Sequence, residues 1–233
     1  MQPRRILRFA LPLLLCFGSL AAQTESVNPG INASYLKEDM VVANWVERLE
    51  REGREVADNR QAIVARLGIK PGMAIADIGT GTGLFLPDLV AAVGPEGKIY
   101  AVDIIEKFLA HVDKHVGQRG WTNVETVLCT ERSAELAPAS IDLAFICNVY
   151  HHFEYPQDTL ASLLGALRPG GRMVLIDFKR IPGVSENWIL NHMRADQATF
   201  EAEIIAAGFT KQREITDLLD DNYFVIFERS PSS

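Results

Sequence analysis

The hydrophobic pattern between residues 73 and 215 alternates between short apolar runs and longer segments with helical spacing. The short runs are rich in β-branched and small residues and end at glycine or polar positions, which is typical of buried strands. Strands are expected at 73–78, 98–103, 124–128, 142–148 and 172–177, and helices at 84–93, 105–116, 157–167 and 187–207. Strands that alternate with helices predict a parallel, doubly wound α/β sheet with helices on both faces.

The flanking segments complete one domain over residues 35–230. Residues 23–34 are polar and predict a linker or surface arm, whereas 35–67 predict one or two amphipathic helices that would form an N-terminal lid. Apolar runs at 209–215 and 223–228 have no helix between them, so they predict a closing antiparallel hairpin.

The chemistry is expected around the segment Ala76-Asp77-Ile78-Gly79-Thr80-Gly81-Thr82-Gly83. It predicts a strand, a tight glycine turn and a helix whose free N–H groups face a ligand. The dinucleotide fingerprint requires a glycine where this chain has Leu84, which disfavours an oxidoreductase that uses a dinucleotide.

Other polar residues follow the remaining strands, where ligands of such sheets bind. Asp103 ends the second strand, 24 residues after Gly79, and its carboxylate is placed to accept ribose hydroxyls; the alternative is an ordinary helix N-cap. The third, fourth and fifth strands end at Cys129-Thr130-Glu131, Asn148–His152 and Asp177.

Four motifs in order resemble class I S-adenosylmethionine (SAM) methyltransferases, in particular the subgroup that includes ubiquinone/menaquinone-type enzymes. They are the glycine segment, Tyr100-Ala101-Val102-Asp103, the fourth strand with its exit (141–153) and the turn Leu167-Arg168-Pro169-Gly170-Gly171-Arg172. The resemblance implies a Rossmann-like sheet of seven strands in the order 3-2-1-4-5-7-6, with strand 7 antiparallel.

It also implies SAM as cofactor, S-adenosylhomocysteine as product, and a set of cofactor-binding residues. Asp103 would bind the ribose, Asp77 the amino end and Glu131 the adenine, although Thr130-Glu131-Arg132 departs from the Asp-Ala pair common in the family. The full expected cofactor set is Asp77, Gly79, Thr80, Gly81, Gly83, Asp103, Ile104, Glu131 and Asn148.

Methyl transfer from SAM is an in-line displacement that depends mainly on positioning the two reactants. A general base is needed only where the acceptor must lose a proton. The expected catalytic candidates are His151, His152, Tyr150 and Asp177, and the expected substrate-binding candidates are His192 and Arg194. The alternative for the histidine pair is a structural role, with one ring packed under the cofactor.

No metal site is expected from the sequence. His111 and His115 are four apart on a predicted helix, but Val112 stands where a zincin motif requires glutamate. Cys129 and Cys147 would lie about 14 Å apart across three strand spacings, too far for a disulfide, so two free thiols are expected.

The N-terminus and the charge bear on location and partners. Arg4, Arg5 and Arg8 precede an apolar run (9–22) that ends in small residues, which predicts a signal peptide over 1–22 and export to the periplasm or beyond, with Arg4-Arg5 fitting the twin-arginine route. If these residues are not a functional signal, the protein is cytoplasmic. Cleavage would remove three arginines and take the net charge from −7 to −10, so neither a nucleic acid nor stable membrane association is expected.

Two functions remain open from the residues. The first is a SAM-dependent methyltransferase that acts on a small-molecule acceptor. The second is a non-catalytic protein that binds a nucleoside or metabolite on the same fold. Both require the glycine turn and Asp103, so these features do not separate them.

Overall fold

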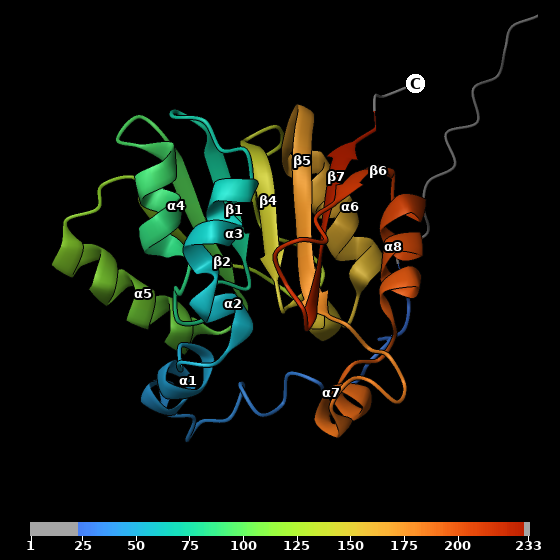
Figure 1. The fold of residues 1–233 in the computed structure, drawn as a ribbon. Helices are drawn as coiled ribbons and strands as arrows, with labels where there is room; N and C mark the ends of the chain where they lie inside the picture. The colour runs from blue at the N-terminus through green and yellow to red at the C-terminus, as the bar shows by residue number, and fades with distance from the viewer. Residues whose placement is uncertain (1–22, 231–233) are drawn as a thin grey trace, which may run out of the picture.

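The computed structural model describes residues 23–230, and these form a seven-stranded sheet between two layers of helices (Figure 1). The strand order is β3-β2-β1-β4-β5-β7-β6, and β7 is antiparallel to both of its neighbours, which confirms the expected topology. The strands are β1 (Ala74–Ile78), β2 (Lys98–Asp103), β3 (Val124–Leu128), β4 (Ile141–Cys147), β5 (Leu167–Phe178), β6 (Phe209–Glu214) and β7 (Asn222–Arg229).

Helices cover both faces of the sheet because its central strands are apolar on both sides. Every residue of β1 is buried, and two hydrophobic clusters lie on opposite faces. The helices on one face are α3 (Arg60–Arg66), α4 (Leu86–Val93) and α5 (Glu106–Arg119); those on the other are α6 (Pro156–Ala166) and α8 (Gln197–Ala206). The short elements α1 (Val42–Leu49), α2 (Glu55–Asp58), η1 (Tyr150–His152) and α7 (Asn187–His192) lie toward the end of the sheet where β1 and β4 finish (Figure 1).

Several boundaries differ from those expected. Helix α5 continues through Gly117 and ends at Gly120, which adopts the left-handed conformation (φ 64°). A glycine inside a helix costs only about 1 kcal/mol, so packing of the apolar side of α5 against the sheet outweighs it. Strand β5 starts at Leu167 rather than 172, and an irregular register against β4 accommodates the intervening turn residues.

Residues 35–67, expected to form an N-terminal lid, also differ in detail from the expectation. This segment holds three short helices, α1 to α3, and residues 36–40 are turns rather than helix. Helix α1 has no buried residue, whereas Val56 of α2 and Ile63 of α3 are fully buried. The part of this segment that packs against the sheet is therefore α2 and α3.

Residues 23–34 form an ordered arm rather than a free linker. The blue N-terminal segment in Figure 1 passes under the carboxyl ends of the strands, between the region of α7 and that of α1. Val27 N donates to the Glu154 carbonyl at 2.9 Å, and the Asn32 side-chain amide donates to the His152 carbonyl at 3.1 Å. The arm is therefore tied to the segment that follows β4.

Among residues 23–230 no helix is both long and apolar enough to span a bilayer. The expected signal peptide over 1–22 lies outside the described residues.

Candidate active site

A cavity of about 160 Å³ opens at the carboxyl ends of β1, β2 and β4. This is the end of a doubly wound sheet where ligands bind, because the strand order reverses there. The cavity lining includes expected cofactor residues from four separate segments: Asp77, Gly79, Thr80, Gly81, Asp103, Ile104, Glu131 and Asn148. Gly83 is not among them; it lies beneath the loop, where an added Cβ would meet Leu86 and Val112.

The glycine loop requires glycine at Gly79 for lack of space and at Gly81 for its backbone conformation. Gly79 has φ 67°, and a Cβ added there would lie 2.4 Å from Cγ1 of Val149. Gly81 has φ 54°, in the left-handed region that favours glycine. The loop therefore packs against the segment that leaves β4, and this contact joins the two sides of the cavity.

Asp103 is fixed by backbone donors. Its Oδ2 accepts a hydrogen bond from Gly81 N at 2.8 Å, and its Oδ1 accepts one from Ile105 N at 2.9 Å. An ionised carboxylate offers about four lone-pair sites, so each oxygen keeps capacity for a ligand hydroxyl. Burial raises the pKa of Asp103 to about 6, and the hydrogen bonds from Gly81 and Ile105 oppose this rise. Asp103 is not the N-cap of α5, because Ile105 holds that position without a side-chain cap bond; Asp103 accepts from Ile105 N and lines the cavity.

Asp77 lies at the end of β1 and accepts a hydrogen bond from the Thr80 hydroxyl at 2.8 Å. Burial raises its pKa to about 7, and the nearby Asp103 raises it further while Thr80 lowers it. Two buried carboxyl groups at one edge of a cavity favour a ligand with a positive charge or several hydroxyls.

On the β4 side of the cavity, the side-chain amide of Asn148 indicates a polar ligand. Asn148 has a positive φ of 55°, and neither its side-chain oxygen nor its side-chain nitrogen has a hydrogen-bond partner within the described chain. A buried amide without partners is costly, by about 1–3 kcal/mol per group, and a ligand in the cavity would supply them.

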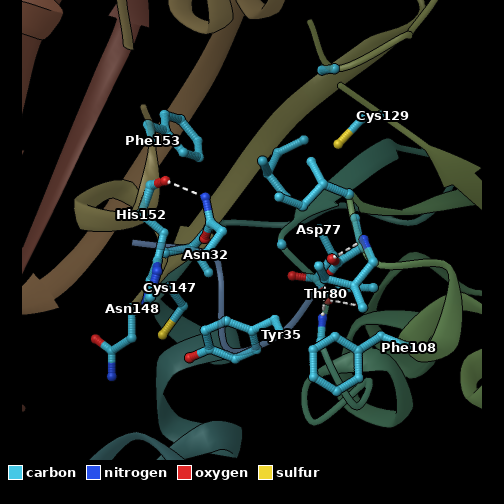
Figure 2. Close-up of a pocket in the computed structure, with 18 of the residues that line it drawn as sticks. Asn32, Tyr35, Asp77, Thr80, Phe108, Cys129, Cys147, Asn148, His152 and Phe153 are labelled. Carbon is cyan, nitrogen blue, oxygen red and sulfur yellow. Dashed lines mark hydrogen bonds between the residues drawn. The ribbon is translucent and has the colours of Figure 1, made fainter. Parts of the chain in front are cut away.

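Aromatic residues close the cavity from the N-terminal side. Tyr35 stacks on Trp45 at 4.3 Å between ring centroids and meets Phe108 and His152 edge-on. Figure 2 places Asn32 and Tyr35 between His152 on one side and the Asp77–Thr80 pair on the other. Such flat apolar walls suit a nucleobase or another planar group.

Of the expected catalytic residues, only His152 lines the cavity. His151 is buried, and its Nδ1 lies 2.8 Å from Asp177 Oδ1 beneath the cavity wall. Tyr150 is fully buried, and its hydroxyl donates to Glu203 at 2.9 Å. Burial lowers the pKa of the His152 imidazole to about 2, with smaller contributions from His151 and His192, so this ring is neutral.

The two residues expected to bind substrate lie in different surroundings. His192 on α7 lies beside His151 and His152, with ring centroids 4.9 and 5.1 Å away. Arg194 instead forms two hydrogen bonds with Glu203, at 2.6 and 2.7 Å, and covers the Phe200 ring. Tyr150 and Arg194 belong to a packed cluster around Glu203, outside the cavity lining. The roles expected of them stay predictions.

The structure adds residues that the sequence did not indicate. Asn32, Tyr35 and Arg54 come from segments without a motif, and Phe108 comes from the apolar face of α5. The sequence signal for this wall is weak: a single aromatic residue, Tyr35, follows the polar arm. Cys129 also lines the cavity; it and Cys147 are free thiols, as expected, and burial raises the pKa of Cys129 to about 12.

Residues 76–173 match the model of a methyltransferase domain, which is less than half of the chain. A similar curated protein is the ubiquinone/menaquinone biosynthesis C-methyltransferase UbiE of Ectopseudomonas mendocina, 28% identical over 117 residues, which are 50% of this chain and 45% of that protein. The match thus spans about half the length of this curated relative.

Solved structures extend the similarity to most of the fold. A SAM-dependent methyltransferase from Aquifex aeolicus aligns with a TM-score of 0.73 at 22% identity, over 82% of this chain and 100% of that one. The [4+2]-cyclase SpnF aligns with a TM-score of 0.62 at 15% identity, over 78% of this chain and 86% of that one. Residues 76–173 thus resemble a methyltransferase domain, and the chain shares its fold with the SAM-dependent methyltransferase from Aquifex aeolicus.

Proposed function

We propose that the protein transfers a methyl group from SAM to a small-molecule acceptor. The single observation that carries this proposal is the position of Asp103: a buried carboxylate, bonded to the glycine loop, at the edge of a cavity with aromatic walls. Glycine loop, acid and cavity together fit an adenosyl ligand, which carries a planar base, two ribose hydroxyls and a charged amino-acid end.

The residues present fit SAM by their donor and acceptor chemistry. Asp103 would accept the ribose hydroxyls, and Asp77 with Thr80 would lie near the positively charged amino group. Glu131 lines the cavity on the β3 side, where the adenine is expected, and Asn148 has free amide atoms for the remaining polar groups. Bound SAM would supply an activated methyl group on a sulfonium.

The remaining work of the chain is positioning. The Tyr35 and Phe108 rings exclude water from the cavity, and the arm over 23–34 holds its outer edge by the bond from Asn32 to the His152 carbonyl. In-line transfer gains most of its rate from holding the two reacting atoms together, so this enclosure is the main catalytic contribution proposed for the protein.

Export is part of the proposal. It rests on the sequence of residues 1–22, with three arginines before an apolar run that ends in small residues. Mass measurement of the mature protein from a native host tests it: a chain that begins near residue 22 or 23 supports export, and an intact N-terminus in the cytosol contradicts it.

Calorimetric titration of residues 23–233 with SAM, S-adenosylhomocysteine and NAD tests the cofactor. We expect both adenosyl ligands to bind with one site per chain while NAD gives no heat. Tighter binding of NAD than of SAM would overturn the proposal in favour of a dinucleotide enzyme.

A second candidate is a binding protein without turnover. It is favoured by one observation: His151, whose ring is held by Asp177 as a general base would be, does not line the cavity. The cavity therefore has no contact with this candidate base. The similarity to a [4+2]-cyclase adds that this fold accompanies more than one chemistry. Adenosyl binding with no release of S-adenosylhomocysteine across a broad panel of small acceptors would favour this candidate.

A further inference from the structure

Three histidines come together beside the cavity although only two are neighbours in the sequence. His151 and His152 lie on η1, and His192 ends α7, 40 residues later. One ring nitrogen from each lies within 4.8 Å of the other two. The ring centroids of His151 and His152 are 4.3 Å apart. Three imidazoles in mutual contact are an arrangement that a metal ion explains and that simple packing does not require.

Asp177 gives His151 the orientation of a metal ligand. Its carboxylate contacts His151 Nδ1 at 2.8 and 3.0 Å, and both side chains are buried. With Nδ1 committed to Asp177, the lone pair of His151 is left on Nε2. A carboxylate that holds the far nitrogen of a histidine is the usual support of histidine ligands, because it fixes the ring and raises its basicity.

His152 contributes a second, independent observation. Its Nδ1 is buried and has no hydrogen-bond partner within residues 23–230. A buried polar atom without a partner costs about 1–3 kcal/mol, so its presence calls for an explanation. Coordination of an ion through this nitrogen would give it a partner and offset that cost.

We propose that His151, His152 and His192 bind one divalent first-row transition metal ion of the Zn²⁺ type, with Asp177 as the positioning residue behind His151. Imidazole suits such ions, and three histidines leave a fourth position for water or substrate.

The geometry requires a small closure. Tetrahedral bonds of about 2.0–2.1 Å place ligand nitrogens about 3.3 Å apart, so the rings must approach from the present spacing. The histidine with the freedom to move is His192, because it ends a six-residue helix and is only half-buried.

The charges near the cluster are mixed. Asp177 supplies a negative charge next to His151, and Phe178 and Trp188 surround the rings with aromatic surface. Arg48, from α1, is the positive group that acts on His192 and opposes a cation. Arg48 acts on His192 more strongly than Asp177 does, whereas at His151 the buried Asp177 carboxylate is in direct contact with the ring.

The position of the cluster deepens the proposed function and rests on it. His152 lines the cavity, so a bound ion would lie at its edge with one position open. An acceptor with a hydroxyl or carboxylate oxygen would occupy that position. The acceptor class is therefore an oxygen-bearing molecule held next to the methyl donor, rather than an apolar one.

Metal binding is tested with ZnCl₂ on untagged protein stripped with a chelator, by calorimetry. Co²⁺ absorbance serves as an independent readout of ligand geometry. We expect one Zn²⁺ per chain and a visible Co²⁺ spectrum of tetrahedral intensity. His192→Asn should abolish both signals, His192→Cys should restore binding, and Asp177→Asn should weaken it by about 10–100-fold.

The matched control is His115→Asn. His115 and His111 form a partly exposed ring pair on α5, with centroids 4.3 Å apart and no third histidine. This variant should bind Zn²⁺ like the wild type. The proposal is overturned if untagged wild-type protein binds no Zn²⁺, or if His192→Asn binds it as tightly as the wild type.

The same samples separate this proposal from the methyltransferase proposal. S-adenosylhomocysteine titrated into His192→Asn should bind as in the wild type, since His192 does not line the cavity. Loss of Zn²⁺ with retained adenosyl binding supports the metal site. Adenosyl binding that is absent from every sample, while Zn²⁺ still binds, defeats the proposed function and leaves the metal site standing.

Discussion

The two sides of the cavity are built in different ways. On the side of β1 and β2, one continuous glycine segment and one acid at the next strand end provide the contacts, and much of the surface is backbone. On the side of β4, the side chains of Asn148 and His152 line the cavity, and His151 and the distant His192 lie next to His152 outside the lining.

This difference teaches which parts of the site are tied to the fold. Backbone donors next to a glycine turn are fixed wherever this strand, turn and helix form, so the first side can bind the same ligand in many proteins. Side chains on a short helix and an exit loop can change without loss of the sheet. If the proposed function holds, the second side is where the acceptor would be selected.

The largest expected effect is the loss of ligand affinity when Asp103, on the first side, is replaced. Asp103→Ala removes the acceptor for two ribose hydroxyls, and hydrogen bonds to a charged group contribute about 1.5–3 kcal/mol each. We expect the affinity for S-adenosylhomocysteine to fall by about 100-fold or more, as measured by calorimetry at pH 8.

The control for this variant is Asp113→Ala, which removes a carboxylate on α5 that accepts from Thr126 away from the cavity. It should bind the ligand like the wild type, and both variants should be compared by thermal unfolding. Near-normal affinity in a folded Asp103→Ala protein would disprove the ribose assignment.

A smaller effect concerns pH, because the carboxyl groups on the first side are protonated more readily than usual. Burial raises the pKa of Asp77 to about 7 and that of Asp103 to about 6. If binding requires one of these carboxyl groups in its ionised form, the affinity should rise from pH 5 to pH 8 by about tenfold where that group is Asp103 and by about 100-fold where it is Asp77. Titrations of S-adenosylhomocysteine across this range measure it, and a flat profile would contradict the role of both acids.

The matched variant is Asp77→Asn, which should flatten the upper part of that profile. It also carries a stability signature. The pKa of Asp77 is higher in the folded protein than its ordinary 3.8, so its contribution to stability is fully present below about pH 3.8 and is lost as the pH rises through about 7. Asn at this position should therefore raise the melting temperature relative to wild type at pH 8 more than at pH 5.

The smallest expected effect concerns Tyr150, and it tests whether this residue belongs to the second side of the cavity or only to the packing behind it. Tyr150→Phe removes the hydrogen bond to Glu203, which Arg194 still holds through two contacts. We expect about 1 kcal/mol less stability in denaturant unfolding and unchanged adenosyl affinity and methyl-transfer rate. A large loss of transfer rate in a stable variant would instead assign Tyr150 to catalysis.

The fold was predictable because its signals are local and repeated. Apolar runs that end at Asp77 and Asp103 mark buried parallel strands, and four motifs between residues 76 and 172 resemble one family in order. The boundaries were less predictable where packing outweighs propensity, as at Gly117 inside α5 and in the early start of β5 at Leu167.

The sequence by itself determined the alternation of strands and helices, the glycine loop and the place of Asp103 at the end of a strand, because each depends on residues close together in the chain, whereas the strand order was implied by the resemblance to one family. Only the tertiary structure decided that Asn32 of the arm over 23–34 lines the cavity and that His192 meets His151 and His152. The physical reason is that these contacts join segments up to 120 residues apart, as between Asn32 and His152, and no local pattern records which distant side chains folding brings together.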